Sequence, residues 1–167
     1  MSRGRGLPAA YPAEVLGRIA ALAEADPQRE VCGFVVRGGS AAELDVVPVR
    51  NVLGEAEAPS GLPASARCGF LVDPAAQLRL FVDLRRGGGE VVACYHSHVD
   101  GPAVLSGVDR EQALLDGSPA LPGAEQLVVA VRGGVAQQIA RFRWNGEVFE
   151  SEPLVRAAHA AAARRAL

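Results

Sequence analysis

The feature that most constrains this chain is a pair of histidines placed directly after a short apolar run. Residues 91–94 have the composition of a buried strand, and side chains on a strand point alternately to its two faces. His96 and His98 are therefore expected to project from one face at the end of that strand. Two imidazoles placed in this way are a ready pair of metal ligands.

A serine and an aspartate follow the histidines at short range. Gly101 and Pro102 turn the chain, and a helical pattern begins at Ser106, with Asp109 in its first turn. From there the carboxylate can reach back toward the strand end. Two histidines and one carboxylate, with a fourth position left to water, are typical of a catalytic zinc site. Ser-x-x-Asp is also a helix-capping pattern, and the two roles are compatible.

Taken together, His96, His98, Ser106 and Asp109 form the pattern H-x-H-x7-S-x2-D. This pattern resembles the motif of the JAMM family, also called MPN-plus or JAB-domain metalloproteases. These are zinc isopeptidases of the deubiquitinase type, which remove ubiquitin or ubiquitin-like proteins. The family also has an upstream glutamate in an E-x-C-G context, and Glu30 stands in that context here.

The resemblance implies one Zn²⁺ per chain, bound by His96, His98 and Asp109. It also implies that Glu30 is the general base and that Ser106 donates a hydrogen bond to the developing oxyanion. Spacing alone does not select Glu30, because Glu90 is nearer to the histidines in the sequence. Glu30 is preferred because its neighbours match the family context. The alternative interpretation is that Glu30 is an ordinary charged residue in a helix-to-strand loop.

Two neighbours of the histidines on the same strand can be placed by alternation. Cys94 shares their face and is either a soft metal ligand or, as we favour, a packing residue. Tyr95 points to the opposite face and is expected in the core. Val99 stands where the family often has proline, which leaves the shape of the following loop open. The short connections between motifs resemble a compact bacterial type of family member.

The periodicity predicts a mixed α/β order of elements. Helices are expected from Pro12 to the Asp26–Pro27 break, from Pro74 to the glycines at 87–89, and from Ser106 onward. Strands are expected at 31–37, 44–49, 70–72, 91–94, 126–132, 135–144 and 148–150. The family resemblance implies an α+β fold of the MPN/JAB kind, similar to cytidine deaminases: a curved, mixed, mostly antiparallel sheet flanked by helices.

The remaining segments complete the expected domain plan. Residues 1–10 are a disordered lead, 11–153 the single MPN domain, and 154–167 an Ala- and Arg-rich helix or tail. Residues 53–66 form a flexible surface loop, either substrate-contacting or a plain linker. Pro48 indicates an edge position or a bulge in its strand. Leu78, Phe81 and Val82 are expected to face the core from their helix.

Composition limits the partners. A formal net charge of −2 without a clustered basic face argues against nucleic acid. No signal peptide or apolar span long enough for a membrane is apparent. Three cysteines are an odd count without a pairing framework, which favours a reducing cytoplasm.

The leading hypothesis is therefore a zinc peptidase that cleaves after the C-terminal tail of a ubiquitin-like protein, with E1- and E2-type enzymes as further partners. One alternative is tail processing of a sulfur-carrier protein for cysteine- or thiamine-type biosynthesis. Another is a non-catalytic MPN scaffold. A zinc nucleobase deaminase would need H-x-E with P-C-x-x-C, and neither occurs.

Overall fold

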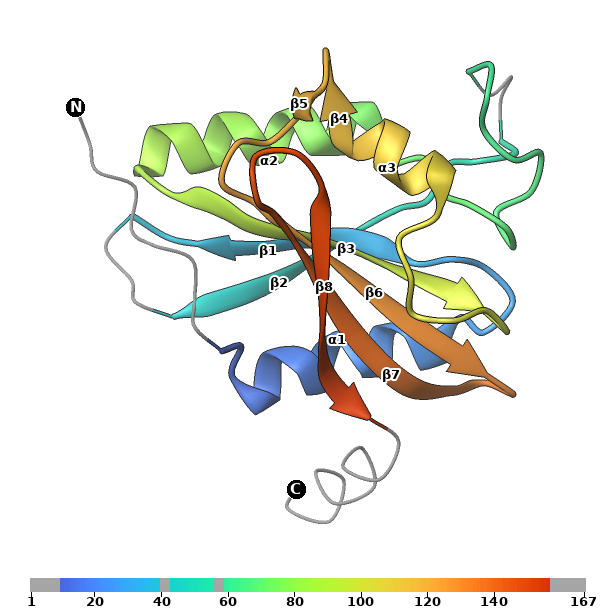
Figure 1. Cartoon of the computed structure of the whole chain (residues 1–167). Coiled ribbons are helices and arrows are strands. Elements are labelled where there is room, and N and C mark those ends of the chain that lie inside the picture. The colour runs from blue at the N-terminus through green and yellow to red at the C-terminus, as the bar shows by residue number, and fades with distance from the viewer. Residues whose placement is uncertain (1–9, 40–42, 56–58, 157–167) are drawn as a thin grey trace.

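A six-stranded sheet with the order β2-β1-β3-β6-β7-β8 runs through the middle of the protein (Figure 1). The computed structural model describes residues 10–39, 43–55 and 59–156. Its strands are β1 (Cys32–Arg37), β2 (Leu44–Val49), β3 (Glu90–Val99), β6 (Glu125–Arg132), β7 (Val135–Trp144) and β8 (Phe149–Arg156). Only the central β3–β6 pair is parallel within this sheet. The expected mixed, mostly antiparallel α+β domain is thus confirmed.

Helices cover the two faces of the sheet (Figure 1). Helix α1 (Ala13–Ala25) buries Val15, Ile19 and Ala23, whose spacing gives one apolar stripe, against one face. Helix α3 (Gly107–Ala113) and the two-residue strands β4 (Leu114–Leu115) and β5 (Ser118–Pro119) lie on the other face. Helix α2 (Pro74–Gly87) lies on the same face as α3, where the Phe81 and Phe34 rings meet at 5.3 Å.

Strand alternation divides the core into two layers. On β6, Leu127 and Val129 belong to the cluster beneath α1, whereas Val128 and Ala130 belong to the cluster beneath α3. Tyr95 is 1% exposed and belongs to the α1 layer. It thus points to the sheet face opposite the histidines, as strand alternation predicted. The histidines of β3 therefore project into the space between the sheet, α2 and α3.

Pro48 lies on β2, which is an edge strand of the sheet, as its position in the pattern predicted. An edge strand has one side without a ladder partner, so a residue that lacks an N–H is tolerated there.

Three expected strands were wrong in extent. Strand β3 runs over Glu90–Val99 and contains both histidines, whereas a strand was expected only at 91–94. Residues 70–72 form only an isolated bridge, between Asn51 and Val72. Conversely, β8 continues to Arg156, although an Ala- and Arg-rich helix or tail was expected from residue 154 onward. Pro153 pairs with Ala140 beside a shift in register on the outer edge of the sheet. Local helical propensity in this segment is therefore overridden by pairing with the long neighbouring strand β7.

The inward-facing side of α2 was also overestimated. Leu78 is 65% exposed, and no residue of this helix is buried. The helix flanks a cleft instead of covering the sheet. The connection at 117–123 includes part of the β4–β5 hairpin. Residues 1–9 of the expected lead, 56–58 of the loop and 157–167 of the tail lie outside the described residues.

Within the described residues, no helix is both long and apolar enough to cross a membrane.

Candidate metal centre

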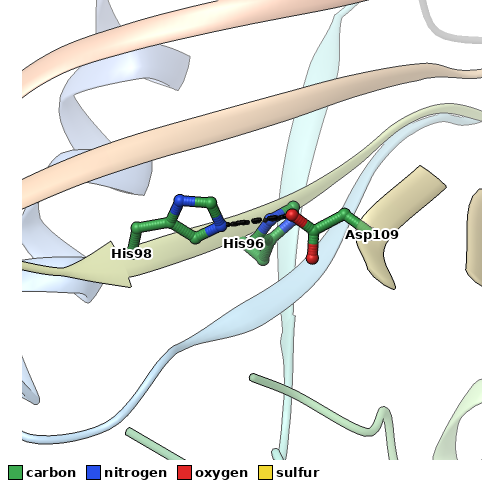
Figure 2. Close-up of side chains that lie close together, drawn as sticks. All are labelled: His96, His98 and Asp109. Carbon is green, nitrogen blue, oxygen red and sulfur yellow. Dashed lines mark hydrogen bonds and ion pairs between the residues drawn. The ribbon is translucent and has the colours of Figure 1, made fainter. Parts of the chain in front are cut away.

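Three potential ligand atoms meet between β3 and the first turn of α3 (Figure 2). The Nε2 atoms of His96 and His98 are 3.1 Å apart, and Asp109 Oδ2 lies 3.4 Å from the first and 3.3 Å from the second. Ligands at the corners of a tetrahedron with bonds of about 2.0–2.1 Å are about 3.3 Å apart. The triangle therefore fits one face of a tetrahedral metal site.

Hydrogen bonds fix the orientation of two of these ligands. The backbone N–H of Ser106 donates to Asp109 Oδ2 at 2.7 Å, and the N–H of Asp109 donates to Ser106 Oγ at 3.2 Å. This reciprocal capping box holds the carboxylate over the strand end. His98 Nδ1 lies 2.9 Å from the carbonyl oxygen of Pro102. Because a carbonyl only accepts, Nδ1 carries a proton, so in the neutral imidazole the Nε2 lone pair faces the other two side chains.

The electrostatics favour the unprotonated forms of Asp109 and His96, which metals require, whereas His98 must lose a proton that its surroundings favour. Burial tends to raise the pKa of Asp109, but hydrogen bonds from His96, His98 and Ser106 hold it well below its usual range. Burial lowers the pKa of His96, although Asp109 acts in the opposite direction. Burial also lowers the pKa of His98, but its hydrogen bond to Asp109 and the charge of Glu30 raise it overall. A cation at the centre would relieve the repulsion among these facing lone pairs.

Glu30 is brought to this cluster by the pairing of β1 with β3. Cys32 stands opposite His96, and one residue earlier Val31 exchanges two hydrogen bonds with Ser97, at 2.9 Å each. The same register, continued by one residue, places Glu30 beside His98. The Glu30 side chain is 5% exposed, and its Oε2 has no hydrogen-bonding partner among the described residues.

Glu90 lies elsewhere. It stands at the start of β3 and forms a 2.8 Å ion pair with Arg37, at the end of the strand away from the histidines. Of the two glutamates that spacing left open, only Glu30 shares the surroundings of the ligand cluster.

Cys94 lies on the same strand face but does not belong to the ligand group found among the described residues. Burial raises the pKa of its thiol to about 12, and a hydrogen bond with Gln126 acts in the opposite direction. A neutral, half-buried thiol of this kind agrees with the packing interpretation. Gly33, in the E-x-C-G stretch, has a packing role as well, because a Cβ there would lie 2.6 Å from the hydroxyl oxygen of Tyr95.

A cleft of about 490 Å³ extends from the ligand cluster between α2 and α3. Its walls include the described loop residues 59–62, Phe70, Gln77 of α2 and Gln112 of α3. Phe70 also stacks on His96, with ring centroids 4.5 Å apart and planes 25° from parallel. Sequence reasoning missed Phe70, because its segment is irregular and carries no periodicity.

Comparison with known proteins agrees with this arrangement. The sequence model of a family described as "Prokaryotic homologs of the JAB domain" matches residues 12–145, which include the three helices, every strand of the six-stranded sheet except β8, and His96, His98 and Asp109. The chain belongs to this family.

This JAB-domain protein also resembles individual proteins. It is 28% identical to the desampylase of Haloferax volcanii over 128 residues, which cover 76% of this chain and 78% of the relative. A solution structure from Desulfitobacterium hafniense aligns with a TM-score of 0.57 and 19% identity, covering 86% of this chain and 88% of the other. One from Salinibacter ruber gives 0.54 and 20%, covering 88% and 90%. At these identities the two structures support the fold.

The burial of Glu30 predicts a pH dependence of stability in the metal-free protein. Burial raises its pKa to about 8 from 4.5, with His98 lowering it and Asp109 raising it. Between these two values the folded state retains a proton that the unfolded chain has lost, so stability falls as pH rises, by up to about 1.4 kcal/mol per pH unit. Glu30→Gln cannot ionise and should lack this contribution.

The measurement is urea unfolding of both proteins in chelator at several pH values from 5 to 8. We expect the stability of wild type relative to Glu30→Gln to decline across the window. Parallel curves would show that the native carboxyl titrates normally. Loading with metal should shrink the effect, because a nearby cation favours the ionised carboxylate.

Proposed function

We propose that the protein is a zinc-dependent peptidase that cleaves after the C-terminal tail of a ubiquitin-like protein. Membership of the JAB-domain family and similarity to a desampylase support a hydrolase of this class. The observation that carries the proposal is the triangle of His96, His98 and Asp109 with the buried carboxyl of Glu30 beside it. A conjugation pathway with E1- and E2-type enzymes would supply such substrates.

Each residue has a part in amide hydrolysis. Zn²⁺ held by His96, His98 and Asp109 would supply a Lewis acid, which polarises a carbonyl and makes water acidic enough to attack near neutral pH. Glu30 takes a proton from the attacking water and passes it to the leaving amine. The Ser106 hydroxyl accepts from the Asp109 N–H, so its own proton remains free to donate to the developing oxyanion.

The cleft suits an extended tail that leads to the ligand cluster. Its apolar lining includes Leu62, Phe70, Leu71 and Leu121, while Gln77 and Gln112 provide polar groups. Loop residues 59–62 line it, which favours the substrate-contacting interpretation of this loop over a plain linker.

The test uses the full chain with a panel of ubiquitin-like and sulfur-carrier proteins from the same genome. Each is joined through its C-terminal glycine either to the side-chain amine of a lysine in a dye-labelled peptide or to the peptide's N-terminus. We expect one zinc per chain and cleavage at that junction, abolished by chelator and restored by Zn²⁺. A fully metallated protein that cleaves no member of the panel would support the scaffold alternative. The preferred junction separates deconjugation from precursor processing.

Ser106→Ala should affect activity and stability separately. We expect kcat to fall about 10²- to 10³-fold from loss of the oxyanion donor. Loss of the N-cap should lower the free energy of unfolding by about 0.5–2 kcal/mol. Cleavage kinetics and urea unfolding measure the two effects.

Two variants provide the controls. Ser106→Thr keeps both the hydroxyl and the cap. Asp73→Ala removes the cap of α2, where Asp73 Oδ1 accepts from Ala75 and Ala76 N–H, but should leave kcat intact. If Ser106→Ala loses stability alone, the serine is only a cap.

A further inference from the structure

A single buried asparagine connects the segment of the general base to the wall of the metal site. Asn51 is 6% exposed and makes four hydrogen bonds through its side chain. Four is the full capacity of an amide, which has two N–H donors and an oxygen with two lone pairs. A fully satisfied buried amide has one well-defined orientation and fixes the groups around it.

Its two donors hold carbonyl groups from separate segments. Asn51 Nδ2 donates to the carbonyl oxygen of Glu30 at 2.8 Å and to that of Gly69 at 3.1 Å. The side-chain oxygen accepts from the N–H groups of Leu53 and Leu71, both at 3.0 Å. The first bond fixes the backbone of Glu30 just before β1 begins.

The other bonds act on the aromatic wall. Gly69 and Leu71 flank Phe70, whose ring stacks on the ligand His96. Residues 70–72 are not a strand of the sheet. Their one bridge consists of the Val52 N–H donating to the Leu71 carbonyl oxygen at 2.8 Å and the Asp73 N–H donating to that of Arg50 at 3.0 Å, and neither bond reaches the backbone of Phe70 itself. Gln112 donates to its carbonyl oxygen at 3.2 Å, and the bonds from Asn51 hold the residues on either side.

We propose that Asn51 is a positioning residue, which sets the general base and the wall over His96 in register with each other. Asn51 is not a member of the ligand group and does not line the cleft beside it, so its loss should leave metal binding intact. The catalytic consequence rests on the proposed function: a misplaced Glu30 lowers kcat with little change in KM. Displacements of about 1 Å reduce rates by about 10²-fold in enzymes that depend on orientation.

The chain offers a matched control, because Asn145 is its only other asparagine. Asn145 Nδ2 donates to Glu150 at 2.7 Å, and its side-chain oxygen accepts from the N–H groups of Glu147 and Val148, at 2.9 Å each. These bonds order the β7–β8 turn. Asn145→Ala therefore removes one donor bond and two acceptor bonds of an asparagine side chain, none of which involves Glu30 or the residues beside Phe70.

The experiment compares Asn51→Asp, Asn51→Ala and Asn145→Ala in the full, zinc-loaded chain. Asn51→Asp keeps both acceptor bonds but loses the donors to Glu30 and Gly69. If its buried charge prevents folding, Asn51→Ser replaces it. We expect one zinc per chain in all variants. In the Asn51 variants, kcat on the panel substrate that wild type cleaves should fall about 10- to 100-fold, while KM should stay within about 2-fold of the wild-type value. In Asn145→Ala, kcat per folded molecule should equal that of wild type.

Crystal structures and amide hydrogen exchange give a readout independent of turnover. The Glu30 carboxyl and the Phe70 ring should shift relative to the ligands, and the Leu53 and Leu71 amides should exchange faster, in the Asn51 variants only. Unmoved groups, or wild-type kcat and KM in a folded Asn51 variant, would overturn the inference. If wild type itself cleaves nothing, the proposed function fails, and the positions of Glu30 and Phe70 alone decide the role of Asn51.

Discussion

Glu30→Gln should keep its zinc and lose about 10²- to 10⁴-fold in kcat. The glutamine amide has nearly the same shape as the glutamate carboxyl. The hydrogen bonds that the backbone of residue 30 makes with Ala66 and Asn51 should therefore persist. It cannot accept a proton from the attacking water or return one to the amine. The ligand triangle lies on other elements and should be unaffected.

Steady-state cleavage of a panel substrate and zinc analysis of the same preparation measure this effect. Glu90→Gln is the matched control, because Glu90 is half-buried in an ion pair with Arg37 at the far end of the strand. It should retain wild-type kcat. Full turnover by Glu30→Gln would remove this residue from the mechanism, and loss of zinc would show that it supports the ligands instead.

His96→Ala and Asp109→Asn should purify without stoichiometric metal and lose turnover almost completely. His96→Ala removes one corner of a triangle whose edges are 3.1–3.4 Å, and Asp109→Asn replaces the anionic oxygen at another corner by a neutral amide oxygen, a much weaker zinc ligand. In each variant two strong protein ligands remain, which are too few for the tetrahedral sites that zinc forms. Asparagine is chosen at position 109 because its side-chain oxygen can still accept from the Ser106 N–H. Loss of metal can then be separated from loss of the helix cap.

Zinc content and thermal unfolding with and without Zn²⁺ measure this prediction. A ligand at about 1,000 times its dissociation constant stabilises a protein by about 4.1 kcal/mol. The melting temperature of wild type should therefore rise when zinc is added, and that of neither variant should change. Cys94→Ala, on the same strand face, is the control and should bind zinc as wild type does. Unchanged zinc occupancy in His96→Ala would mean that the ligands are elsewhere.

The fold was predictable where local rules governed it. Helix α1 followed from its apolar stripe and the Asp26–Pro27 break, and the strands β1, β2, β6 and β7 followed from apolar runs between turn residues. Prediction failed at β8 and at residues 70–72. Neither segment has a local pattern that decides its structure, because β8 depends on pairing with β7 and the segment around Phe70 on hydrogen bonds to Asn51.

What the sequence by itself determined is the group of facing side chains that could hold a metal ion. His96 and His98 share a strand face by simple alternation, and Asp109 lies one helical turn from its capping serine, so both relations hold over a few residues of chain. Which glutamate joins them was decided only by the tertiary structure. Glu30 reaches the cluster because β1 pairs with β3, and a contact across so many residues depends on the packing of the whole sheet.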